Sequence, residues 1–119
     1  MNRKWLLACL TCSLVLAAFL AFPRSDQAQV SAACFCSAGC NPVTGTAGND
    51  VLTGTAGCDC MIGGAGDDII DGAGGNDFIC GNDGNDTLDG GSGDDRIDGG
   101  NGTDNCNGGT GTNTLFNCP

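Results

Sequence analysis

Aspartate recurs at one fixed phase of this 119-residue chain. From residue 50 onward an acid stands at every ninth position, and an amide ends the row: Asp50, Asp59, Asp68, Asp77, Asp86, Asp95, Asp104 and Asn113. Asp and Asn are common in turns, but turn propensity does not explain one acid at one phase of a period. Because carboxylate oxygens are ligands of hard cations, the row predicts a series of similar cation sites.

The side chains needed for most catalytic sites are missing. The chain has no His and no Tyr, and after residue 33 it has no Lys, no Glu and one Arg, Arg96. General bases and catalytic zinc sites usually depend on these residue types. Phe78 and Arg96, which are 18 residues apart, are expected on neighbouring strands, with Asp98 on the same strand as Arg96. An aromatic ring, an Arg and an acid in this arrangement more often form packed surface contacts than a catalytic site. We therefore expect a binding protein and not an enzyme.

Residues 1–33 have the composition of a secretory signal peptide. Arg3 and Lys4 precede an apolar run over 5–22, and small residues follow at Ser31–Ala33. This order is typical of a cleaved export signal. An uncleaved anchor is the alternative, since about 18 apolar residues nearly span a bilayer. We expect cleavage, no membrane insertion afterwards, and a secreted or extracellular protein, with a periplasmic or cell-surface location as alternatives.

The part after residue 33 is strongly acidic. It carries thirteen Asp and one Arg, which gives a formal charge of −12. A chain this acidic is repelled by nucleic acid and by anionic membranes, and it attracts cations. We expect no nucleic-acid partner, and we expect a monomer.

A nine-residue repeat organises the chain from Gly45 to Phe116. Cutting at every ninth residue gives eight segments with no insertion: GTAGNDVLT, GTAGCDCMI, GGAGDDIID, GAGGNDFIC, GNDGNDTLD, GGSGDDRID, GGNGTDNCN and GGTGTNTLF. The first and fourth positions are always Gly, and the sixth is the acidic row. The eighth is apolar: Leu52, Met61, Ile70, Ile79, Leu88, Ile97, Cys106 and Leu115.

These segments resemble the RTX, or haemolysin-type, calcium-binding nonapeptide G-G-x-G-x-D-x-U-x, in which U is a large apolar residue. They depart from it at the second position, where Thr46, Thr55, Ala73 and Asn82 replace Gly, and at Asn113. The resemblance implies an all-β fold, a parallel β-roll (a two-sheet β-solenoid) with calcium-binding turns. Two nonapeptides complete one coil, so residues 18 apart stack about 4.8 Å apart. Odd repeats then build one sheet and even repeats the other.

The resemblance also implies a ligand set for calcium. Each ion would lie between the turns of repeats i and i+2, with both sixth-position side chains as ligands and backbone carbonyls of the first, third and fifth positions completing the shell. The pairs are Asp50/Asp68, Asp59/Asp77, Asp68/Asp86, Asp77/Asp95 and Asp86/Asp104, with a weaker Asp95/Asn113 site. The first-position carbonyls belong to Gly45, Gly54, Gly63, Gly72, Gly81, Gly90, Gly99 and Gly108. Magnesium fits poorly, because it demands a tight octahedron and keeps its waters.

Apolar burial alone is too small to fold this chain. One apolar side chain per repeat contributes roughly 1.5–3 kcal/mol, whereas ordering nine residues costs on the order of 10 kcal/mol. Stacked aspartates also repel one another. We therefore expect folding to be coupled to calcium binding.

Cysteines supply the second expected source of stability. Eight follow residue 33, and an even number in a short exported chain is typical of disulfides. The segment 36–44, CSAGCNPVT, has the phase of a degenerate repeat, which places Cys40 and Cys58 one coil apart and within disulfide range. We expect this pair, a looser Cys60–Cys80 pair on neighbouring strands and a Cys106–Cys118 cap, with no partner assigned to Cys34 and Cys36.

The expected organisation is a signal peptide over 1–33, a cysteine-rich cap over 34–44, eight repeats over 45–116 and a C-terminal cap over 117–119. The function expected is that of an exported calcium-binding β-roll that folds or rigidifies when calcium binds. The alternative is a disulfide-held structural, adhesive or ice-binding solenoid, for which the outward side chains are too irregular. RTX segments are typically appended to toxins, proteases or lipases, and no such activity is expected here.

Overall fold

The computed structural model describes residues 34–119, so the expected signal peptide at 1–33 lies outside the described residues. Within residues 34–119 the fold is all-β, and no helix there is long and apolar enough to cross a membrane. The strands are β1 (Asn41–Thr44), β2 (Val51–Thr53), β3 (Asp59–Ala65), β4 (Ile69–Asp71), β5 (Phe78–Asp83), β6 (Thr87–Asp89), β7 (Arg96–Asn101), β8 (Asn105–Asn107) and β9 (Thr114–Phe116).

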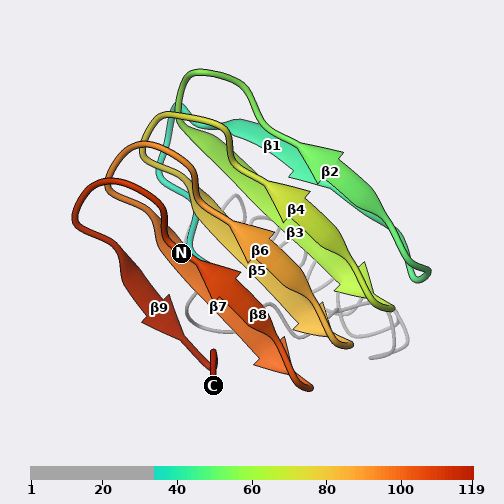
Figure 1. The fold of residues 1–119 in the computed structure, drawn as a ribbon. Helices are drawn as coiled ribbons and strands as arrows, with labels where there is room; N and C mark the ends of the chain where they lie inside the picture. The colour runs from blue at the N-terminus through green and yellow to red at the C-terminus, as the bar shows by residue number, and fades with distance from the viewer. Residues whose placement is uncertain (1–33) are drawn as a thin grey trace, which may run out of the picture.

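The strands form two parallel sheets that the chain visits in turn (Figure 1). One sheet has the order β1-β3-β5-β7-β9, and the other has the order β2-β4-β6-β8. Val51 pairs with Ile69, and Cys60 pairs with Phe78, so each neighbour lies 18 residues further along the chain. This confirms the β-roll, with two nonapeptides per coil and with odd and even repeats in separate sheets.

The strands of the two sheets differ in length. Strands β2, β4, β6 and β8 have three residues each, whereas β3, β5 and β7 have six or seven. After β4, β6 and β8 the ninth-position side chain accepts the N–H of the residue two further on, as in Asp71 with Ala73 and Asp89 with Gly91. These side chains turn the backbone, so the ladder stops. In the second, fourth and sixth repeats the strand instead continues past the ninth position into the next repeat.

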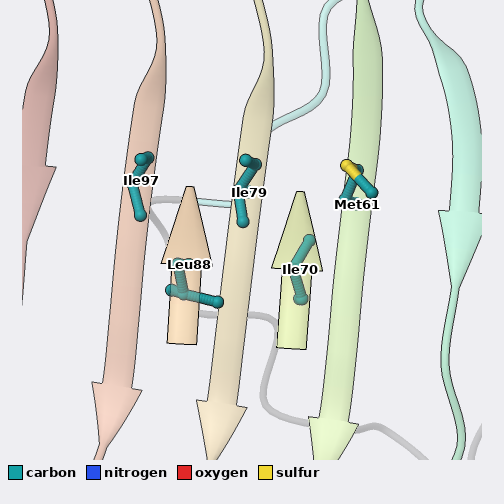
Figure 2. Close-up of a cluster of buried hydrophobic side chains, with 5 residues drawn as sticks. All are labelled: Met61, Ile70, Ile79, Leu88 and Ile97. Atoms are coloured by element: carbon teal, nitrogen blue, oxygen red, sulfur yellow. The ribbon is translucent and has the colours of Figure 1, made fainter. Parts of the chain in front are cut away.

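The core is one row of side chains per sheet, all from the eighth position (Figure 2). Its buried members are Met61, Ile70, Ile79, Leu88 and Ile97. Val43 and Leu52 pack against the row at one end, and Cys106 and Cys118 pack at the other. The expected core position is thus confirmed along the middle of the roll. It fails at Leu115, which is 42% exposed, because no further strand of the opposite sheet follows β9 to cover it.

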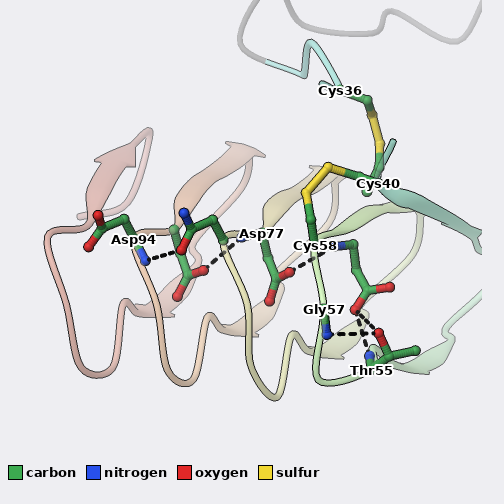
Figure 3. Close-up of a disulfide and its surroundings, with 11 residues drawn as sticks. Cys36, Cys40, Thr55, Gly57, Cys58, Asp77 and Asp94 are labelled. Atoms are coloured by element: carbon green, nitrogen blue, oxygen red, sulfur yellow. Dashed lines mark hydrogen bonds between the residues drawn. A yellow bond between two sulfur atoms is a disulfide. The ribbon is translucent and has the colours of Figure 1, made fainter. Parts of the chain in front are cut away.

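Disulfides fasten both ends of the roll. At the C-terminal end Cys106 is bonded to Cys118 over a Cα–Cα distance of 5.9 Å. At the N-terminal end Cys40 is bonded to Cys58 over 4.7 Å (Figure 3). Both bonds are as expected, the Cys40–Cys58 bond from the phase of the repeat and the Cys106–Cys118 bond as a cap at the end of the roll.

The expected Cys60–Cys80 bond is wrong. Cys60 is bonded to Cys36, and Cys80 is bonded to Cys34. Cys60 stands opposite Phe78 in the ladder, so it is offset by two residues from Cys80. Cys34 and Cys36 are also two residues apart, and this spacing matches the offset. The N-terminal segment is therefore tied to β3 and to β5.

Candidate metal centre

The sixth-position side chains form two ladders along the roll, one for the odd and one for the even repeats. From Asp68 to Asp104 one carboxylate oxygen, Oδ1, accepts the backbone N–H of the sixth-position residue one coil earlier, at 2.8 to 2.9 Å. Asp77, for example, accepts from Asp59 (Figure 3). The side chains are held in one orientation by these bonds, and Asp59, Asp68, Asp77, Asp86, Asp95 and Asp104 are all buried. The expected row of acids is thus two ordered columns inside the turns.

The second oxygen of these carboxylates lacks a partner in the middle of the roll. It is buried and accepts no hydrogen bond in Asp68, Asp77, Asp86, Asp95 and Asp104. A buried acceptor left unpaired costs about 1–3 kcal/mol, and a charged one costs more. The arrangement is therefore incomplete without a positive charge or a donor at each Oδ2.

Each unpaired oxygen points to a space beside the first-position glycine of its own repeat, which we call the glycine space. A Cβ on Gly72 would stand 2.6 Å from Oδ2 of Asp77 and 2.6 Å from the carbonyl oxygen of Gly90, one coil further on. Gly63 and Gly81 are surrounded in the same way by their own aspartate and the next coil's carbonyl. Carboxylate and carbonyl oxygens thus converge where only glycine leaves room.

Burial makes the charged form of these carboxyl groups unfavourable. It raises the pKa of Asp68, Asp86 and Asp95, and it raises the pKa of Asp77 to about 6. The N–H bond from the preceding coil lowers the pKa of Asp77 in part, and the negative charges of Asp95 and Asp59 raise it again. A cation in the glycine space would reverse this balance, because an opposite charge favours the ionised carboxylate.

The first two turns are closed differently. Oδ2 of Asp50 accepts the backbone N–H of Thr46 at 2.6 Å and its hydroxyl at 2.9 Å. Oδ2 of Asp59 accepts the same two groups of Thr55 at 2.6 and 3.0 Å (Figure 3). The second-position threonines therefore occupy the oxygen that is left unpaired further along the roll.

The backbone of these two turns also differs. From the third repeat onward the second and fourth positions have positive φ, for example 121° at Gly64 and 105° at Gly66. Ala73 and Asn82 adopt it as well, at 67° and 77°. Neither Thr46 nor Thr55 does so, because a β-branched residue is strongly disfavoured there. The residue at position two thus selects one of two turn conformations.

The row ends in an amide that is satisfied without a cation. Oδ1 of Asn113 accepts the N–H of Asp95 at 2.8 Å, as an aspartate would. Its Nδ2 donates to the carbonyl oxygen of Gly109 at 3.3 Å.

One coil beyond Gly99, the carbonyl of Asn117 lies beside the glycine space of Asp104. Sequence reasoning missed Asn117, which occupies the first position of an incomplete ninth repeat.

A second ladder runs through the fifth position. Asn49 accepts the N–H of Asp67 at 3.0 Å, and Asp67 accepts that of Asn85 at 2.9 Å. On the other side of the roll, Asn76 accepts the N–H of Asp94, and Asp94 accepts that of Thr112 (Figure 3). Neither Asp67 nor Asp94 is among the residues that the sequence analysis assigned to a site. The recurrence of Asn and Asp at this position was the signal for their role between coils.

Asp98 differs from its ninth-position counterparts. The sequence placed it on the outer face of a strand, but it is buried and accepts a bond from Nδ2 of Asn117 at 2.7 Å. Phe78 and Arg96 are paired in the ladder, as expected. The Arg96 guanidinium lies over the ring of Phe116, 4.5 Å from its centre. Arg96 and Phe116 thus pack together across the last two strands of this sheet, β7 and β9.

Within residues 34–119 no three His, Cys, Asp or Glu side chains gather into a metal-binding group. A family model described as the RTX calcium-binding nonapeptide repeat (4 copies) matches residues 44–79 and 81–115. No curated protein and no solved structure matches the chain.

Proposed function

Because this chain belongs to the family of RTX calcium-binding nonapeptide repeats, which bind calcium ions, we propose that it is an exported β-roll whose turns become ordered when calcium binds. The observation that carries this proposal is the two columns of buried carboxylate oxygens without partners, each oxygen directed at a glycine space. These oxygens suit calcium, which takes six to eight oxygen ligands from carboxylates and backbone carbonyls.

The ligands proposed are the sixth-position side chains and the carbonyls of the first-position glycines. Asp68, Asp77 and Asp86 fit this role best, since each combines an unpaired Oδ2 with a carbonyl from the next coil. When bound, calcium supplies the positive charge and the oxygen bonds that the carboxylates lack. The glycines keep the space open, and the N–H bonds from the preceding coil hold each carboxylate in place.

Coupled folding follows from the weakness of the other contributions. The core holds one side chain per repeat, and the six buried aspartates stack in two columns of like charge, one for the odd and one for the even repeats. Without a cation, burial and mutual repulsion oppose the ionised state. Binding free energy then becomes folding free energy, because the glycine spaces do not exist in the unfolded chain.

Export is supported by the cysteines. All eight cysteines of residues 34–119 are joined in four disulfides. Such bonds persist in oxidising compartments and are rare in the cytosol. Together with the leader expected at 1–33, they favour an extracellular, periplasmic or cell-surface location. We assign the protein a binding role and no catalytic role.

Far-UV circular dichroism tests the proposal. The disulfide-bonded protein is treated with EDTA and then titrated with calcium, with magnesium as the control. A gain of β signal with calcium and none with magnesium is expected. A β spectrum that is the same in EDTA and in calcium would contradict coupled folding and would favour the disulfide-held scaffold.

A further inference from the structure

The two columns of sixth-position aspartates each contain two kinds of turn, and these differ in whether the carboxylate Oδ2 is unpaired. In the turns from Asp68 to Asp104 it is unpaired, and in the turns of Asp50 and Asp59 the equivalent Oδ2 is bonded to a threonine. This difference lies within the site to which the proposed function assigns calcium, so any role given to the threonines there rests on that function.

We propose that threonine at the second position closes a turn in place of calcium. The threonine hydroxyl donates to the aspartate Oδ2, and it accepts the N–H of the fourth-position glycine at 3.2 Å in both turns. The backbone N–H of the same threonine donates to Oδ2 as well. Two donors on one carboxylate oxygen satisfy the group that would otherwise face an ion.

The bonded oxygen is the one that matters for the ion. A Cβ on Gly54 would stand 2.8 Å from Oδ2 of Asp59, so this oxygen faces the glycine space. Asp59 does keep an unpaired oxygen, Oδ1. That oxygen lies at the N-terminal end of the ladder, where the N–H of Asn41 donates to the carbonyl of Cys58 instead.

The backbone supports the same division. The fourth-position glycines of the two threonine turns, Gly48 and Gly57, lack the positive φ that every later fourth-position glycine adopts. The first-position carbonyl keeps its place, since the carbonyls of Gly63 and Gly72 lie beside Gly45 and Gly54 as the next coil's carbonyl does in the later turns. The first two turns therefore depart from the middle of the roll in the hydrogen bonds of the carboxylate and in the backbone of positions two and four.

The number of complete ion positions follows from this division. A complete position has an unpaired Oδ2 on both aspartates of a pair, and three pairs meet this condition: Asp68/Asp86, Asp77/Asp95 and Asp86/Asp104. The Asp50/Asp68 and Asp59/Asp77 pairs, which the resemblance predicted, each lose one oxygen to a threonine. The second-position residue is thus a specificity-determining residue that decides which turns take calcium.

Counting the bound ions tests this inference. Calcium-loaded, disulfide-bonded protein is analysed by native mass spectrometry as the wild type, as the Thr46→Gly/Thr55→Gly variant and as a Thr44→Gly/Thr53→Gly control. The control removes two exposed threonines from the same region. We expect about three ions in the wild type and control, and a gain of about two in the Thr46→Gly/Thr55→Gly variant, by the pair count and the oxygen ligand preference of calcium.

Each result is informative. About five ions in the wild type would overturn the inference and leave the calcium-binding function standing, and this count holds even if the variant fails to fold. An unchanged count in a folded Thr46→Gly/Thr55→Gly variant would also overturn it, since the threonines would not be what closes the turns. No bound calcium in the wild type would instead refute the proposed ligand set on which the inference depends.

Discussion

The N-terminal end of the roll and its middle contain the same repeat but complete the turns by different means. In the first two turns Thr46 and Thr55 bond to the sixth-position carboxylates, and the adjoining segment is tied down by the disulfides of Cys34, Cys36 and Cys40. From the third repeat onward the sixth-position carboxylates keep an unpaired oxygen. Between the third repeat and Cys106, the one cysteine is Cys80, which is bonded to Cys34.

The difference shows what a repeated motif leaves undetermined. Asp59 and Asp77 occupy the same position, and both are buried. Asp59 has its Oδ2 satisfied by the chain itself, whereas Asp77 has not. The N-terminal end is therefore expected to hold its structure without calcium and to provide an edge on which the middle coils order when calcium is present.

The largest effect is expected from the core that both regions share. Ile79 is fully buried between the sheets, and Ile79→Ala is expected to lower the free energy of unfolding by about 2–5 kcal/mol. The measurement is urea unfolding in excess calcium. Val51→Ala is the control, because Val51 is 75% exposed, and it should change the free energy by less than about 0.5 kcal/mol. Equal effects would contradict the two-row core.

The next effect is expected from the disulfide between Cys40 and Cys58 at the N-terminal end of the roll. Cys40→Ser/Cys58→Ser opens a loop of 18 residues and is expected to cost about 3 kcal/mol. It should also remove the β signal that remains in EDTA. Cys106→Ser/Cys118→Ser opens a loop of 12 residues at the other end and should leave that signal in place. If the Cys106→Ser/Cys118→Ser variant abolishes the signal instead, the calcium-independent structure lies at the C-terminal end, which would contradict the account.

Alanine at the fourth position distinguishes the two turn conformations. Gly84 has a φ of 138° and lies against the backbone of Gly66, whereas Gly57 has no positive φ, and a Cβ there would meet only the Thr55 hydroxyl at 3.8 Å. Gly84→Ala is expected to destabilise the calcium-loaded protein by about 1–3 kcal/mol. Gly57→Ala is expected to be neutral or stabilising by up to about 1 kcal/mol. Similar melting temperatures for the two variants would contradict the division into two turn types.

The smallest effect is expected on calcium affinity, and it distinguishes a proposed ligand from an exposed aspartate of the same turn. Asp86 belongs to two of the three complete pairs, and Asp86→Asn keeps the acceptor for the N–H of Asp68 while removing the charge. We expect a loss of calcium affinity of ~10-fold, about 1.4 kcal/mol, in calorimetric titration. Asp83→Asn removes the same charge from an exposed side chain of that turn, which accepts from Asn101, and it should change affinity far less. A larger effect of Asp83→Asn would refute the ligand assignment.

Much of this architecture was predictable because it is periodic. The eighth-position row of Ile70 and Ile79, the odd and even sheets and the Cys40–Cys58 bond all follow from the 18-residue repeat. The C-terminal bond between Cys106 and Cys118 follows from their places at the end of the roll.

The features that the sequence did not predict depend on contacts that are not periodic. The partners of Cys34 and Cys36 lie on strands that the N-terminal segment meets only after it has folded back. The role of Thr55 depends on its own φ, which is set by its branched side chain and not by the motif. Burial of Asp98 depends on the C-terminal residue Asn117, which comes after the last repeat.

Hydrogen exchange of the disulfide-bonded protein, followed by mass spectrometry in EDTA and in calcium, tests the division most directly. The amides that hydrogen-bond β1 and the first threonine turn to β3 should be protected under both conditions. One example is the N–H of Gly45, which donates to the carbonyl of Ile62. The amides between the middle turns, such as Gly84 N–H to Asn101, should be protected only in calcium. Equal protection of the two regions in EDTA, or equal loss of it, would contradict the account.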